Sequence, residues 1–182
     1  MSQPVRPDLL PVRERGSRRV YVVIDTPAGS RNKYKYDVAF GLYRVSRTLP
    51  AGSVFPYDFG SIPQTRAADG DALDVLVLGL APTFPGCLVT ARLIGLLRAR
   101  QSEHGRSIRN DRLIAVGETP VNSSPLRELN RLEPEELRAI EHFFESYNRF
   151  QGRAFRISGR EGRAGAEAAL ARAERLFRRA QP

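Results

Sequence analysis

The sequence predicts an α+β fold that contains a small β-barrel. Short segments rich in β-branched and aromatic residues alternate with Pro- and Gly-bearing turns through about residue 116. Helical apolar spacing then appears after residue 134. This order, many short strands and then helices, is typical of the α+β class. The 182 residues suffice for one well-cored domain. We expect that domain over residues 20–182, after an N-terminal arm over residues 1–19.

The N-terminal half supplies most of the expected strands. The arm is rich in proline and arginine and has little apolar periodicity. Turn residues at 27–30, at Pro82 and at Pro85-Gly86 separate the extended segments that follow. Strands are expected over residues 20–24, 33–37, 42–45, 73–80 and 87–97.

The C-terminal half supplies the expected helices. The polar segment 100–111 must be a surface loop or the tip of a hairpin, and residues 112–116 return as a strand. A helix starts near Pro134, and after a short strand at 154–157 a second helix covers about 164–179. The two apolar stripes are Leu137, Ile140, Phe144 and Tyr147, and Ala166, Ala169, Leu170, Ala173 and Phe177. We interpret all of them except Tyr147 as core.

Composition excludes several classes of function. The net charge of +9 comes mainly from scattered arginines without aromatic interleaving, which disfavours nucleic-acid binding. Acidic partners or phosphorylated small molecules remain open. No apolar run approaches the roughly 18 residues of a membrane helix. The single cysteine, Cys87, excludes an internal disulfide and lies in an apolar run. We therefore expect an inert thiol and a cytoplasmic protein.

The run Asp69-Gly70-Asp71-Ala72-Leu73-Asp74 places three carboxylates in six residues, directly before the apolar run Val75-Leu76-Val77-Leu78. Clustered carboxylates repel one another, and burial raises the cost of each charge. Strand alternation puts Asp74 on the same face as Leu76 and Leu78, unlike an acid in a solvated turn. A plain Asp-Gly turn is the alternative. The pattern favours a bound divalent cation, with Mg²⁺ the natural choice.

With this motif the sequence resembles the soluble family I inorganic pyrophosphatases over about residues 20–180. The hexapeptide matches the family signature, with alanine at a position that is usually proline. The supporting blocks are Ile24-Asp25-Thr26-Pro27, Gly29-Ser30-Arg31-Asn32-Lys33-Tyr34, Phe55-Pro56-Tyr57-Asp58-Phe59-Gly60, Phe84-Pro85-Gly86 and His142-Phe143-Phe144. The resemblance implies a five-stranded OB-like β-barrel flanked by helices, often assembled as a homo-oligomer, a hexamer in bacteria.

The resemblance also implies an activity, the Mg²⁺-dependent hydrolysis of pyrophosphate by a metal-activated water. Asp69 and Asp74 would be metal ligands, and Asp71 would receive the proton of the attacking water. The remaining implied residues hold phosphate oxygens: Lys33, Arg47, Tyr147, and Arg112 in place of a family lysine.

Several positions depart from the family pattern. Lys35 replaces a metal-site glutamate, Asp25 stands for a glutamate and Phe59 for a tyrosine. The other departures are Ser102 and Asn110 for two metal-binding aspartates and Asn148 for a phosphate-binding lysine. Asn110 retains an amide oxygen for a weak metal contact, and Glu103, His104 or Asp111 could partly compensate.

A charge count shows that the replacements of metal-site acids keep the net charge of the pocket. A glutamate with one bound Mg²⁺ carries a net charge of +1, and Lys35 alone carries the same charge. Two aspartates with one bound Mg²⁺ are neutral, and so are Ser102 and Asn110 together. The hypothesis is a pyrophosphatase with fewer metals and a lower rate than its relatives. The alternatives are action on another phosphoanhydride, a weak or inactive protein of this fold that binds a phosphorylated ligand, and a nucleic-acid binder, which the lack of an aromatic platform disfavours.

Overall fold

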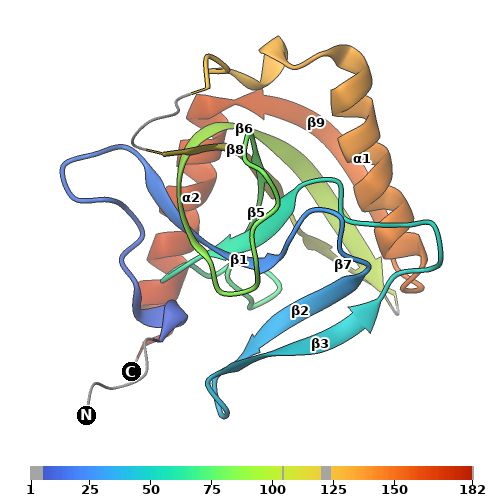
Figure 1. The fold of residues 1–182 in the computed structure, drawn as a ribbon, viewed down its shortest axis with the longest axis horizontal. Helices are drawn as coiled ribbons and strands as arrows, with labels where there is room; N and C mark the ends of the chain where they lie inside the picture. The colour runs from blue at the N-terminus through green and yellow to red at the C-terminus, as the bar shows by residue number, and fades with distance from the viewer. Residues whose placement is uncertain (1–5, 104, 120–123, 182) are drawn as a thin grey trace.

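A ring of five strands forms the centre of the computed structural model, which describes residues 6–103, 105–119 and 124–181 (Figure 1). In the ring, β1 pairs with β4, β4 with β5, β5 with β8, β8 with β6, and β6 again with β1. Only the β5–β8 pairing is parallel. The ring strands are β1 (Val20–Thr26), β4 (Asp58–Ile62), β5 (Leu73–Leu78), β6 (Leu88–Glu103) and β8 (Arg112–Glu118). The predicted α+β class with an OB-like arrangement of five strands is confirmed.

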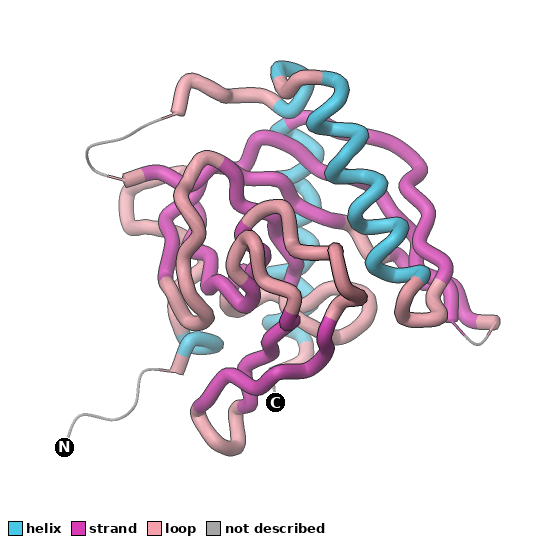
Figure 2. The backbone as a smooth tube through the Cα atoms, turned by 45° about the vertical axis from the view of Figure 1, so that its right-hand side comes forward, coloured by secondary structure: helices cyan, strands magenta, loops and turns pink. Residues whose placement is uncertain are grey.

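The other elements flank this ring. Strands β7 (Arg106–Arg109) and β9 (Ala154–Gly162) pair with the far part of β6, while β2 (Asn32–Asp37) and β3 (Leu42–Thr48) form a separate hairpin. Helix α1 (Pro134–Arg149) contacts β9, and α2 (Arg163–Arg179) packs on β6 and β9. Figure 2 shows both helices, in cyan, against the strands. Among the described residues, no helix is long and apolar enough to cross a membrane.

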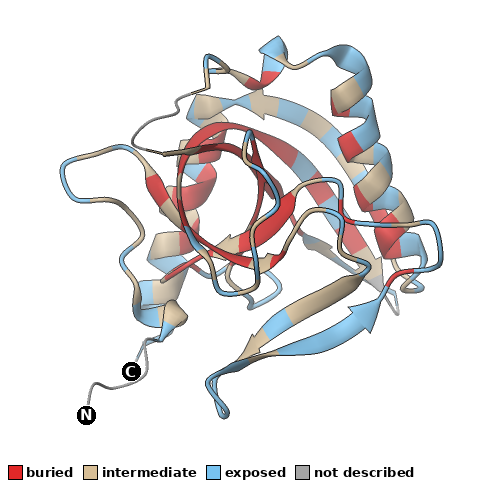
Figure 3. Cartoon of the chain, in the orientation of Figure 1, coloured by how far each residue is buried: buried red, intermediate tan, exposed pale blue. Residues whose placement is uncertain are grey.

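Strand alternation divides the core into two clusters. Val75 and Val77 of β5 belong to a cluster with the small residues of α2. Leu76 and Leu78 belong to a cluster with Phe144 and other residues of α1. Asp74 is in phase with the second pair, so its predicted strand face is confirmed. The ring is buried, whereas the β2–β3 hairpin is mostly exposed (Figure 3).

The sequence reading missed strand β4. Pro56 and Gly60 interrupt its apolar pattern, so this segment reads as a turn. In the structure, a β-carbon on Gly60 would lie 2.3 Å from the carbonyl oxygen of Val23. The missing side chain therefore permits the close approach of β4 to β1. The same glycine that makes the segment resemble a turn in the sequence is needed for the strand pairing.

Pairing lengthens other strands beyond their apolar runs. The segment expected to be a loop or a hairpin tip is a hairpin, because β6 continues to Glu103 and pairs with β7. The predicted short strand at 154–157 extends to Gly162 along β6. Cys87 precedes β6 and is partly buried, and burial raises the pKa of its thiol, as expected of an unreactive cysteine.

The described part of the arm lies against the domain. Arg13 bridges to Val20 and forms an ion pair of 2.5 Å with Glu167 of α2. The Gln64 amide donates to the carbonyl of Leu9 at 2.9 Å. These contacts fix residues 6–19 along the surface; treating the arm as a separate unit stays a prediction.

Candidate active site

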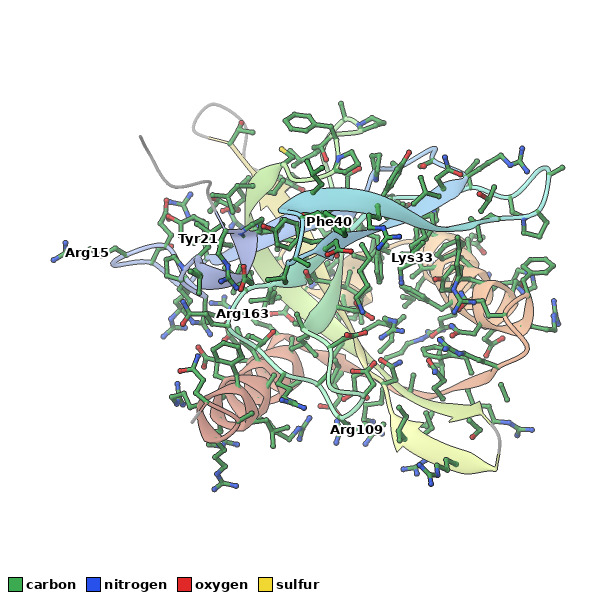
Figure 4. The ribbon with its side chains drawn as sticks, turned by 90° about the horizontal axis from the view of Figure 1, so that it is seen from below. Arg15, Tyr21, Lys33, Phe40, Arg109 and Arg163 are labelled. Atoms are coloured by element: carbon green, nitrogen blue, oxygen red, sulfur yellow. The ribbon has the colours of Figure 1, made fainter. Side chains whose placement is uncertain are left out.

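A cleft of about 790 Å³ is lined by all eight predicted site residues: Lys33, Arg47, Asp69, Asp71, Asp74, Asn110, Arg112 and Tyr147. Lys33 and Arg47 come from the β2–β3 hairpin. The others come from β5 and the turn before it, from β8 and the segment between β7 and β8, and from α1. Figure 4 looks onto that hairpin, with Lys33 labelled on β2 and Phe40 in its turn. The fold therefore collects residues that lie far apart in the sequence into one cleft.

The acidic turn before β5 has a defined backbone. Gly70 has φ of +92°, which a residue with a side chain adopts only at a cost. The amide of Asp71 donates to Asp69 Oδ1 at 3.2 Å, and the amide of Ala67 donates to the Asp71 carbonyl at 2.8 Å. This turn brings the two carboxylates to the start of the strand that carries Asp74.

A fourth carboxylate, that of Asp25, faces the same cleft. It is the extra residue of a bulge in β1, and it lies near Ser61, which pairs with Asp74 across β4 and β5. Burial, and after it the charge of Asp74, raises the pKa of Asp25 to about 7. The same two causes raise the pKa of Asp69. The acids therefore destabilise one another's ionised forms.

Arg112 holds Asp74 in a largely buried ion pair. The guanidinium Nη1 lies 2.7 Å from Asp74 Oδ2, with the two side chains 6% and 21% exposed. The same nitrogen donates to the amide oxygen of Asn110, and Asn110 donates in turn to Gln101 at 2.9 Å. The guanidinium carbon also lies 5.2 Å from the ring centre of Phe155. The predicted metal contact of Asn110 stays a prediction, and it would require an oxygen that now accepts from Arg112.

Lys35 and Asp71 form the second ion pair of the cleft. Their Nζ and Oδ1 atoms are 2.9 Å apart, and each side chain is 63% exposed. The hydrogen bond to Asp71 is the main cause that raises the pKa of Lys35, and the charges of Asp74 and Asp69 act in the same direction. The ammonium thus lies in the field of all three motif acids, and its direct partner, Asp71, could not be predicted from the sequence.

The opposite wall of the cleft is basic and aromatic. Lys33 and Arg47 are direct cross-strand partners on the hairpin. The Lys33 ammonium lies 5.2 Å from the ring centre of Phe59 and 5.5 Å from that of Tyr147. Tyr147 is both a core residue, stacked on Phe143, and a cleft residue. Phe59 thus presents an aromatic face, and no hydroxyl, to the Lys33 ammonium.

One expected substitute for the loop acids, Asp111, does not line the cleft. Asp111 is buried beside the β6–β7 hairpin, where it accepts from the Ala99 amide at 3.1 Å and from Arg109 at 2.5 Å. The expectation that Asp111 compensates is therefore wrong. Ser102 does not line the cleft, whereas Asn148 does. The Glu103 side chain and His104 lie outside the described residues. Sequence reasoning missed Ser61 and Gln101, which only the strand register reveals as cleft residues.

The donor set fits a divalent cation held by few protein ligands. The carboxylates of Asp69, Asp71 and Asp74 are hard oxygen donors in one cleft, and burial, followed by the charge of Asp74, raises the pKa of Asp69. Within the described ranges, however, no three acidic, histidine or cysteine side chains converge on one point. A cation here would complete its coordination shell with water or phosphate oxygens, as Mg²⁺ commonly does.

A five-stranded OB-like ring whose cleft is lined by carboxylates together with lysine and arginine suits a hydrolase that acts on phosphorylated compounds with metal assistance. The comparisons with known proteins agree with this class. The family model described as inorganic pyrophosphatase matches residues 22–178. The chain belongs to the inorganic pyrophosphatase family.

Individual relatives match over most of their length. The inorganic pyrophosphatase of Methanosarcina acetivorans is 38% identical over 78% of this chain and 82% of its own. That of Streptomyces coelicolor is 36% identical over 86% and 94%, respectively. The crystal structure of the Thermus thermophilus inorganic pyrophosphatase superposes with a TM-score of 0.86 at 30% identity, covering 96% of this chain and 99% of that one.

Proposed function

We propose that this protein hydrolyses inorganic pyrophosphate to two phosphates in a Mg²⁺-dependent reaction. The observation that carries the proposal is the cleft itself, in which the acidic turn faces the paired cations Lys33 and Arg47. The named relatives favour this activity over that of an inactive protein of the same fold that only binds a phosphorylated ligand. The departures from the family pattern support a lower rate than that of typical relatives.

Lys33 and Arg47 are suited to hold the substrate. Like charges that lie directly opposite each other on two strands are destabilising unless something neutralises them. A phosphate group between the two cations would do so, and Tyr147 lines the same cleft with a hydroxyl able to donate. These three residues would orient the anion toward the acidic turn.

Asp71 is the proposed proton acceptor. Water attacks one phosphorus atom and forms a new P–O bond, its proton passes to the Asp71 carboxylate, and the bond to the bridging oxygen breaks, which releases the second phosphate. Asp69 and Asp74 would hold the cation, and Arg112 keeps Asp74 oriented. A divalent cation supplies neutralisation of phosphate charge and a lower pKa of the water that it holds.

The test is phosphate release from pyrophosphate and from a panel of nucleotides with Mg²⁺, for the wild type and for Asp71→Asn. We expect pyrophosphate to be the preferred substrate and the variant to be slower by about 10²-fold or more, as for loss of a general base. Asp37→Asn is the matched control, because Asp37 lies on the β2–β3 hairpin, pairs with Arg44 and does not line the cleft. Equal rates for Asp71→Asn and the wild type, or no release by the wild type, would contradict the proposal.

We also propose a cytoplasmic homo-oligomer, with a hexamer as the expected form. The unpaired cysteine fits a reducing compartment. Exposed apolar side chains on the hairpin (Val38, Phe40, Leu42 and Val45) offer surface for association. Light scattering coupled to size-exclusion chromatography tests the assembly, and a monomer at micromolar concentration would contradict it.

A further inference from the structure

We infer that the Lys35 ammonium acts as a built-in cation beside Asp71 and takes the place of one divalent metal ion in the cleft. The inference rests on the proposed metal-assisted hydrolysis for its purpose, and its test counts metal ions directly. Lys35 would be a positioning residue that acts through Asp71.

The first argument is the position of the ammonium. Its Nζ lies 2.9 Å from Asp71 Oδ1, and Asp69 and Asp74 contribute to the raised pKa of Lys35. A cation at this position is attracted by all three motif acids. A second metal ion next to Asp71 would have to displace this ammonium or share the carboxylate with it against charge repulsion.

The second argument is the charge balance. The three motif acids and Asp25 carry at most four negative charges, and they share the cleft with two cations fixed by the chain, Lys35 on Asp71 and Arg112 on Asp74. At most two net negative charges remain, so a single divalent ion already neutralises the cluster. Each further divalent ion would enter without net attraction from the cluster and against the charges of Lys33 and Arg47 in the same cleft.

The third argument is the origin of Lys35. It projects from β2 of the separate hairpin, and Asp71 lies on the turn before β5. Within the described residues, no three potential metal-binding side chains converge in this cleft. The sheet register therefore presents a lysine, and not a further oxygen ligand, to the exposed side of the acidic turn.

The experiment counts bound Mn²⁺ per chain by electron paramagnetic resonance during a titration, with and without inorganic phosphate. The proteins are the wild type, Lys35→Glu, Lys35→Met and the control Arg44→Glu. Arg44 is the cross-strand partner of Lys35 and does not line the cleft, so the control makes the same charge change outside it.

We expect Lys35→Glu to bind one more Mn²⁺ than the wild type, or to bind the weakest ion about tenfold more tightly, with a smaller gain for Lys35→Met. Arg44→Glu should match the wild type. Equal counts and affinities in the wild type and both Lys35 variants would overturn the inference, as would an equal gain in Arg44→Glu.

Two further controls keep the outcome decisive. Circular dichroism melts check that each variant folds, and if Lys35→Glu does not fold, Lys35→Met decides through its Mn²⁺ affinity. Phosphate release is measured in parallel on the wild type. A wild type that releases no phosphate while Lys35→Glu gains an ion would overturn the proposed function and leave the role of Lys35 supported.

Discussion

The two ion pairs of the acidic turn differ in almost every physical respect. Arg112 and Asp74 are 6% and 21% exposed, and the guanidinium is further fixed by Asn110 and by aromatic rings. Lys35 and Asp71 are both 63% exposed. A buried pair is costly to break because it leaves an uncompensated charge, whereas an exposed pair is screened and contributes little to stability. One pair is therefore built into the fold, and the other is free to exchange.

The difference follows from the origin of each cation. Arg112 begins β8, which pairs with β5 inside the ring, so it shares a sheet with Asp74. Lys35 reaches Asp71 from a hairpin that belongs to a separate two-stranded sheet. Metal and substrate can therefore change the contacts of Asp71 without disturbing the core.

The largest expected effect comes from breaking the buried pair. Arg112→Met should lower the free energy of unfolding by about 2–3 kcal/mol, because Asp74 keeps its charge and loses its partner. Urea unfolding measures the loss. In the double variant Arg112→Met, Asp74→Leu part of the stability should return, and the same loss in both proteins would argue against the pair.

The next effect concerns Asp25, an acid in the cleft whose pKa is raised to about 7 from an ordinary value of 3.8. The folded chain binds this proton more tightly than the unfolded chain does, so its contribution to stability falls as pH rises from about 4 to about 7 and then stays level. Because Asp25 is partly exposed, we expect the free energy of unfolding to fall by about 2 kcal/mol over this range. Asp25→Asn should remove this slope when unfolding is followed against pH with a chelator present. An unchanged slope would refute the assigned cause.

A smaller change tests the wall that faces the two pairs. Tyr147→Phe removes one hydroxyl and keeps the ring that contacts Phe143 and Lys33. We expect kcat/KM for pyrophosphate to fall by about tenfold, the usual cost of losing a hydrogen bond to a charged group, with no change in the melting temperature. An unchanged kcat/KM would place the hydroxyl outside the reaction.

The smallest expected effect comes from breaking the exposed pair. Lys35→Met should change the free energy of unfolding by less than about 1 kcal/mol, and added salt should reduce the difference further. Urea unfolding at low and high salt measures both. A loss as large as that of Arg112→Met would erase the distinction between the two pairs.

Local pattern predicted the parts of this molecule that depend on neighbours in sequence. The strand phase of Asp74 and the stripes of α1 and α2 could be predicted because each depends on one element. Strand β4 and the polar half of β6 could not be predicted in this way. Their composition does not favour a strand, and pairing with distant strands stabilises them. The resemblance to a known family predicted which residues line the cleft. The contact of Lys35 with Asp71 joins the β2–β3 hairpin to the turn before β5, and only the structure shows it.

The most direct test is the anomalous diffraction of crystals soaked with Mn²⁺ and phosphate. We predict a Mn²⁺ peak within ligand distance of Asp69 and Asp74, phosphate beside Lys33 and Arg47, and no metal peak between Lys35 and Asp71. A Mn²⁺ ion between Lys35 and Asp71, with the lysine turned away, would contradict the central claim that this chain supplies one of its own cations.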